Sequence, residues 1–81
     1  MKKIVLEHEK PSHPAPGYYF CTVSLASGSV TLQIPNADDD DWQPMTDGVF
    51  SAAGDCSVYV SSGGIRASII GDGGAFLERI N

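Results

Sequence analysis

The sequence lacks the features on which nucleic-acid binding and membrane insertion depend. Its 81 residues include only five Lys or Arg against ten Asp or Glu, which gives a net charge of −5. Binding to nucleic acid requires a basic face, whereas this chain is acidic. No apolar run approaches the ~18 residues that a membrane-spanning helix needs. We therefore expect one small domain, with neither nucleic acid nor a membrane among its partners.

Cysteine is also scarce, since Cys21 and Cys56 are the only two. They cannot form a disulfide framework, and the chain has no second Cys or His pair at zinc-ligand spacing. Both lie in apolar runs, where free thiols are commonly buried, so two free thiols are favoured over one disulfide. The apolar run 4–6 is too short for the core of a signal peptide, which predicts that the chain is made in the cytoplasm of its producer and is kept there or released only by lysis.

Helical periodicity is missing as well, and nine Gly and five Pro divide the chain into short pieces. Alternating apolar and polar side chains indicate strands instead. The predicted strands are 3–10, 18–25, 30–34, 42–45, 49–52, 56–61, 65–70 and 75–80. We expect the second and third of these to pair as a hairpin and the last three to form a meander. The sequence thus predicts an all-β fold, a small antiparallel β-sandwich of about seven to eight short strands with jelly-roll or immunoglobulin-like topology.

The predicted organisation is an N-terminal strand with a Pro-rich arm, residues 1–17, followed by the sandwich domain, residues 18–81. A true immunoglobulin domain is excluded because Trp42 lies too far from Cys21 and Gly54 stands where a Tyr is required. A domain of this size without a disulfide or metal is expected to gain stability by association, as a homo-oligomer or with another protein.

The arm carries three of the candidate partner-binding residues: Pro11, Pro14 and Pro16. Prolines at this density favour an extended, stiff segment that loses little entropy on docking. We expect the arm to reach onto a neighbouring subunit. Removal of residues 1–16 would then abolish assembly and leave a folded domain.

Three aromatic residues, Tyr18, Trp42 and Tyr59, are the other candidate partner-binding residues, because Tyr and Trp are enriched at protein interfaces. An aromatic platform for a sugar is the alternative use of such side chains.

Four consecutive carboxylates form the most acidic segment: Asp38, Asp39, Asp40 and Asp41. A hard cation such as Ca²⁺ would relieve their repulsion, but the alternating ligands and central Gly of an EF-hand are missing. We interpret the segment as a solvated loop or a contact with a charged partner, and only as a weak candidate for a metal site.

Catalytic residues do not stand out. The chain has no Gly-x-Ser-x-Gly elbow, and its glycine-rich segments 62–64 and 71–74 lack the strand–turn–helix context of a phosphate loop. His8 and His13 have no partner that the sequence identifies. The prediction is a protein that is not an enzyme and needs no cofactor.

Several segments in order resemble small structural proteins of bacteriophages. They are V-T-L-Q at 30–33, Trp42 after the acidic loop, D-G-V-F at 47–50, V-Y-V at 58–60, G-I-R-A at 64–67 and A-F-L-E-R-I at 75–80. The resemblance covers about two thirds of the chain. It implies a virion-associated β-sandwich, either a capsid decoration (cement) protein or a small head or tail component, with other virion proteins as partners. It carries over no catalytic residue.

Two other function classes stay open. One is a carbohydrate- or cell-surface-binding module that uses Trp42, Tyr59 and the aspartate segment. The other is an inhibitor that presents its acidic loop to a basic site, since acidic proteins can match a positively charged surface.

Overall fold

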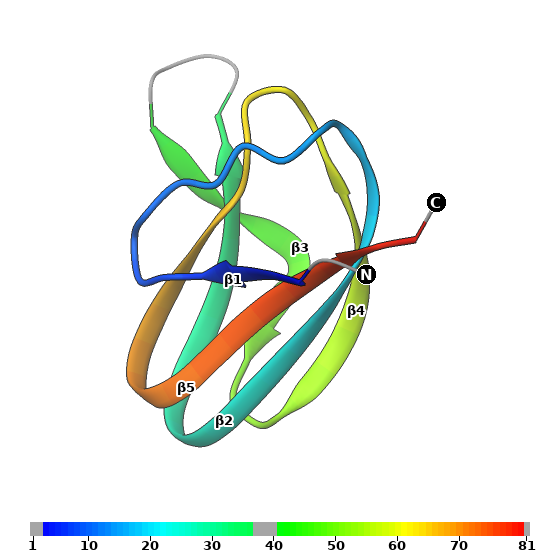
Figure 1. The fold of residues 1–81 in the computed structure, drawn as a ribbon. Coiled ribbons are helices and arrows are strands. Elements are labelled where there is room, and N and C mark those ends of the chain that lie inside the picture. The colour runs from blue at the N-terminus through cyan, green and yellow to red at the C-terminus, as the bar shows by residue number, and fades with distance from the viewer. Residues whose placement is uncertain (1–2, 37–40, 81) are drawn as a thin grey trace.

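The computed structural model describes residues 3–36 and 41–80, which form an all-β fold (Figure 1). Its strands are β1 (Lys3–Leu6), β2 (Gly17–Pro35), β3 (Trp42–Phe50), β4 (Gly54–Val60) and β5 (Arg66–Arg79). All five belong to one antiparallel sheet, which confirms the predicted all-β, antiparallel class. None of the described residues forms a helix that could cross a membrane.

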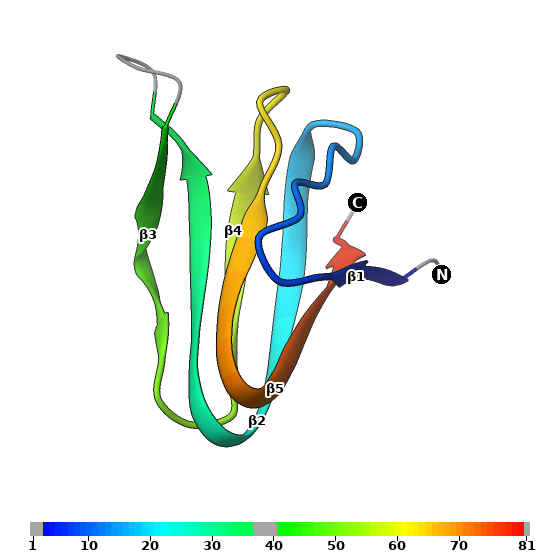
Figure 2. The same cartoon turned by 90° about the vertical axis from the view of Figure 1, so that its left-hand side faces the viewer.

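The two longest strands, β2 and β5, pair along almost their whole lengths. The register runs from Tyr19 opposite Arg79 to Gln33 opposite Arg66. Both strands turn back on themselves at one end of the molecule, as two nested U shapes (Figure 2). The sheet is therefore folded over, and its two halves face each other.

Two glycines permit this fold-over. Gly28 and Gly71 lie opposite each other with φ of 88° and 87°, and the register shifts between Leu25 and Ser27. A Cβ atom on Gly28 would lie 1.9 Å from the carbonyl oxygen of Ile70. Only glycine combines this backbone conformation with so close an approach.

Each half of the folded sheet has its own edge strands. The first half-sheet consists of β1, residues 73–79 of β5, residues 17–25 of β2, and β4. The second half-sheet consists of residues 66–72 of β5, residues 27–35 of β2, and β3. Thus β4 and β3 pair with the same edge of β2, β4 along its first part and β3 along its last part.

The core lies between the two half-sheets. Side chains alternate between buried and more exposed along much of β2 and along β4, as the period of two in a pleated strand requires, whereas β3 is irregular. The buried apolar residues are Leu6, Tyr19, Cys21, Val23, Val30, Leu32, Val58, Val60, Ile65, Ala67, Ala75 and Leu77. No polar or charged residue of the described chain is buried.

The predicted hairpin and meander are wrong. Residues 18–25 and 30–34 belong to one strand and pair with β5, not with each other. Residues 65–70 and 75–80 likewise lie almost entirely within β5, while β4 pairs with β2. Five strands therefore replace the predicted seven to eight. A glycine with positive φ serves a hairpin turn and a bend within a strand equally well, so the local pattern could not separate them.

The N-terminal arm lies on the protein's own sheet. The amide of Glu9 donates to the Ala67 carbonyl at 2.8 Å. Ser12 and Ile65 exchange backbone hydrogen bonds of 2.8 and 3.0 Å. The arm thus covers the side of β5 that β2 leaves unpaired, so the segment expected to reach a neighbour is engaged within the chain.

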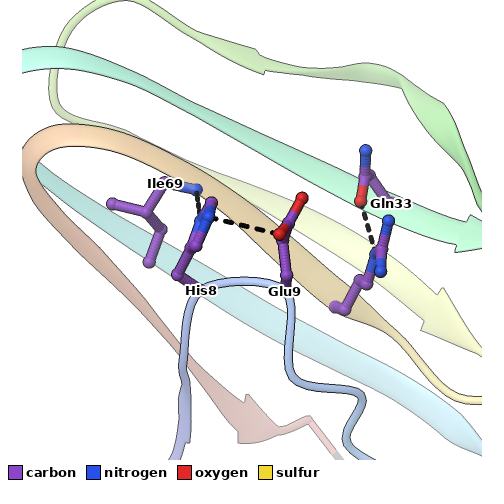
Figure 3. A network of polar contacts seen from close by, with 5 residues as sticks. His8, Glu9, Gln33 and Ile69 are labelled. Carbon is purple, nitrogen blue, oxygen red and sulfur yellow. Dashed lines mark hydrogen bonds and ion pairs between the residues drawn. The ribbon is translucent and has the colours of Figure 1, made fainter.

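His8 adds a side-chain bond to this contact. Its Nδ1 accepts a hydrogen bond from the Ile69 amide at 2.8 Å, and its Nε2 lies 3.5 Å from a carboxylate oxygen of Glu9 (Figure 3). His8 is therefore one of the groups that hold the arm on β5.

Substitution of His8 tests this role. We expect His8→Ala to lower the free energy of unfolding by about 1 kcal/mol, because the Ile69 amide loses its partner. Amide hydrogen exchange of Ile69 should become faster. Lys10→Ala is the control, because its ion pair with Glu7 is exposed and such pairs contribute little. Equal exchange rates at Ile69 in the wild type and His8→Ala would contradict the assignment.

Candidate partner-binding site

The outer surface of the first half-sheet carries side chains that point away from the core. The register places Tyr59 of β4 opposite Tyr18 of β2, and Phe76 of β5 opposite Thr22 of β2. Phe76 in turn lies opposite Val5 of β1. We call the apolar side chains of this surface the aromatic face: Val5, Tyr18, Phe20, Tyr59, Phe76 and Ile80.

This face gathers most of the exposed apolar side chains of the described residues. Seven large hydrophobic residues are exposed, and five of them lie on this face: Val5, Tyr18, Phe20, Tyr59 and Ile80. Ile80 belongs to it because its amide donates to the Tyr18 carbonyl and continues the β2–β5 ladder. Contiguous apolar patches of this kind mark interaction surfaces.

The two tyrosines pack against each other across β2 and β4. Their ring centroids are 5.1 Å apart and the ring planes meet at 66°, an edge-to-face arrangement. Each ring therefore supports its neighbour while more than half of the Tyr18 and Tyr59 surface stays exposed, at 57% and 54%. Such mutually braced aromatic side chains lose little further freedom when a partner covers them.

Charged side chains lie within this face as well as at its edges, since Glu78 is directly opposite Phe20. Lys3 lies opposite Glu78, and its ammonium group is 4.6 Å from the centre of the Phe76 ring. Asp55 lies opposite Thr22 at the other side of the half-sheet. The face therefore combines apolar side chains with charged ones.

Trp42 does not join the two tyrosines. It lies on the second half-sheet, opposite Pro35, and its ring is 5.0 Å from the Arg66 guanidinium. Arg66 also donates from Nε to the Gln33 side-chain oxygen at 2.6 Å (Figure 3). Because the half-sheets face each other through the core, their outer surfaces point apart. The structure therefore does not bring Trp42 and Tyr59 together as a sugar platform.

The three prolines are spread along the arm: Pro16 directly precedes β2, whereas Pro11 adjoins Ser12, which bonds to Ile65. Pro11 and Pro16 are exposed and Pro14 is half-buried. The carbonyl of Ala15, between the last two prolines, accepts hydrogen bonds from the Tyr19 hydroxyl at 2.6 Å and from Arg79 at 3.1 Å. This part of the arm is thus held in place next to Tyr18.

The acidic segment is described only in part, because Asp38, Asp39 and Asp40 lie outside the described residues. Asp41 is exposed, its carbonyl accepts from the Asn36 amide, and its carboxylate accepts from the Trp42 amide at 2.9 Å. Within 3–36 and 41–80, no three His, Cys, Asp or Glu residues gather into a group that could hold a metal ion.

One open hollow lies where β2 and β5 bend. It has a volume of about 430 Å³ and is lined by Ser24, Leu25, Ala26, Asp72, Gly73 and Gly74. A hydroxyl and a carboxylate are present, but the lining has no His, Cys or Lys. The arrangement is a surface depression beside a strand bend and supplies no set of groups for nucleophilic catalysis.

The sequence named Tyr18 and Tyr59 as candidates but not Val5, Phe20 and Ile80, which the structure places on the same face. A signal existed for Phe20, since Tyr18 and Phe20 add two aromatic side chains to the face of 18–25 that lies opposite Tyr19, Cys21 and Val23. Large apolar side chains on the second face of a strand indicate a covered or binding surface. Comparison of the chain with protein-family models, with curated proteins and with solved structures found no match.

Proposed function

We propose that the protein is a non-enzymatic structural subunit that binds the protein lattice of a phage-like particle through its aromatic face. It acts there as a small β-sandwich that decorates and stabilises a capsid, or connects head or tail components. The observation that carries the proposal is the clustering of exposed apolar side chains on one surface of the first half-sheet. The sequence resemblance to small phage structural proteins supports the choice of a virion lattice as the partner.

The shape of the surface favours a protein over a small ligand. Small molecules bind in concave pockets that bury most of their surface, whereas this face is the outside of a sheet. A sugar platform needs an aromatic ring that lies flat against the sugar, and the rings of Tyr18 and Tyr59 meet at 66°. The matching partner is a protein with a broad apolar surface. That surface would also carry hydrogen-bond acceptors for the hydroxyls of Tyr18 and Tyr59.

Binding to a lattice also suits the size of the domain. A core of this extent supplies only a few kcal/mol of net stability. Anything that binds the folded state alone adds to that stability by mass action. A lattice offers many identical sites, so the protein would be held in its folded form on the particle.

A pair of matched variants tests the proposal. The full chain is mixed with particles assembled from the virion proteins encoded beside it, and co-sedimentation is measured. We expect Tyr18→Ser to weaken binding by at least about tenfold, because buried aromatic anchors dominate interface energy. Val49→Ser is the control, because Val49 is equally exposed, at 63%, but lies on the second half-sheet. Both variants should keep the wild-type melting temperature within a few degrees.

Three results would overturn the proposal. The first is the absence of co-sedimentation of the wild type. The second is an equal loss of binding in Val49→Ser, which would place the contact elsewhere. The third is the finding that two copies of the protein bind each other through the aromatic face in the absence of particles, detected first as a dimer mass in solution.

A further inference from the structure

The two cysteines meet across a pair of strands. Cys21 of β2 lies directly opposite Cys56 of β4. Directly opposed residues of antiparallel strands have Cα atoms about 4.5 or 5.5 Å apart, and a disulfide spans about 4.4–6.8 Å. The backbone therefore already has the spacing of a cross-strand disulfide. The ladder that holds it runs from Gly17 opposite Val60 to Val23 opposite Gly54.

The side chains of the pair share one face of the sheet. Cys21 is fully buried in the core, and Cys56 is partly buried and packs against it. The two groups are free thiols. Directly opposed residues of antiparallel strands place their side chains on the same face with Cβ atoms about 4.5–5.5 Å apart, so the two thiols are neighbours.

The two thiols differ in access. Among the described strands, β4 pairs only with β2, so Cys56 stands on an edge strand and keeps part of its surface in solvent. Cys21 lies behind it with no exposed surface. A reagent in solution reaches Cys56 first.

We propose that Cys21 and Cys56 form a dithiol site that is oxidised by a small disulfide, such as oxidised glutathione, to a cross-strand disulfide. The Cys56 thiolate attacks one sulfur of the small disulfide, whose S–S bond breaks and releases one thiol. The Cys21 thiolate then attacks the Cys56 sulfur, the mixed disulfide breaks, and a second thiol is released. The protein loses two hydrogen atoms in total, and the small disulfide is reduced to two thiols.

The environment of the pair makes this reaction slow at neutral pH. Burial and the neighbouring Cys56 raise the pKa of Cys21 to about 12. Burial, and then the carboxylates of Asp55 and Asp47, raise the pKa of Cys56 above its ordinary value, against a smaller lowering by the hydrogen bond with Cys21. The thiolate is the reactive form, so the rate of closure should rise with pH. The site stays reduced in a reducing cytoplasm and closes in an oxidising medium.

Closure would connect the two strands that carry Tyr59 and Tyr18. The disulfide would join residues far apart in sequence and restrict the unfolded chain, which raises the melting temperature. It would also fix the edge strand β4 against β2. The oxidised protein is therefore the form with the more rigid aromatic face.

The experiment uses the full chain with oxidised or reduced glutathione at neutral pH and at about pH 9, on the alkaline side of an ordinary cysteine pKa. With oxidised glutathione we expect both thiols to disappear, the mass to fall by two hydrogen atoms, and peptide mapping to recover a Cys21–Cys56 link. Closure should be about tenfold faster for each unit of pH in this range. The melting temperature should rise by roughly 10 °C.

Two variants separate the steps. Cys21→Ser should stop at a stable glutathione adduct on Cys56, because the resolving thiol is missing. Cys56→Ser should keep its remaining thiol unmodified while folded. Persistence of both thiols in the wild type at the higher pH would overturn the proposal. So would a stable glutathione adduct on the wild type, or a disulfide between two chains.

Discussion

Removal of residues 1–16 is expected to abolish the cooperative thermal transition of the protein. Leu6 is only 2% exposed and belongs to the core, and β1 pairs with β5 from Lys3–Glu78 to Leu6–Ala75. The rest of the arm covers residues 65–69 through hydrogen bonds that the amides of Glu9 and Ser12 donate and one that His8 accepts. A domain of this size has only a few kcal/mol of net stability, and loss of one buried leucine costs about 2–5 kcal/mol.

The measurement is circular dichroism during heating, with a point variant beside the truncation. Leu6→Ala should lower the free energy of unfolding by about 2–5 kcal/mol. Val5→Ala should change it by less than about 0.5 kcal/mol, because the neighbouring Val5 is 68% exposed. A truncated chain that melts cooperatively at the wild-type temperature would contradict the structure. It would support the prediction from the sequence that the domain stays folded without residues 1–16.

Gly28→Ala is expected to destabilise the protein by about 3 kcal/mol or more, because it combines backbone strain with a severe overlap. Gly28 has φ of 88°, and the new Cβ would lie 1.9 Å from the Ile70 carbonyl oxygen. That atom is backbone and belongs to the partner strand at the bend, so neither strand can move without disturbing the ladder. The bend of β2 and β5 would open, and the half-sheets would separate.

Gly74→Ala is the matched control for this bend. It lies in the same region of β5, but its nearest non-neighbouring atom to a new Cβ is the Ser24 hydroxyl oxygen at 3.7 Å. Its backbone has no positive φ. We expect the free energy of unfolding to stay the same or to rise by up to about 1 kcal/mol, because alanine restricts the unfolded chain more than glycine. Chemical denaturation of both variants provides the comparison, and equal stabilities would show that the bend does not depend on Gly28.

The alternation along individual strands predicted much of the local structure. The inward set Tyr19, Cys21 and Val23 and the outward set Tyr18 and Phe20 follow directly from a period of two. The same alternation accounts for the burial of Val30 and Leu32, and of Val58 and Val60. Such assignments need only neighbouring residues, so the sequence contains them in full.

Pairing between strands was harder to predict. Nothing local distinguishes Gly28 as a bend within one strand from Gly28 as the turn of a hairpin, since both conformations require the same backbone freedom. The choice depends on β5, which is about forty residues further along the chain and bends at Gly71 in register with Gly28. The contacts of the arm were hidden for the same reason, because its partners Ile65 and Ala67 are distant in sequence.

By itself, the sequence determined an acidic, small, all-β protein, the face on which most side chains of each strand lie, and Tyr18 and Tyr59 as candidate contacts. Only the tertiary structure decided that the two tyrosines pack edge to face, that Trp42 lies on the opposite half-sheet, and that Cys21 meets Cys56. The physical reason is that side-chain alternation is a local property of the chain. Contact between strands is set by the register of residues far apart in sequence, and that register emerges only when the whole sheet folds around its core.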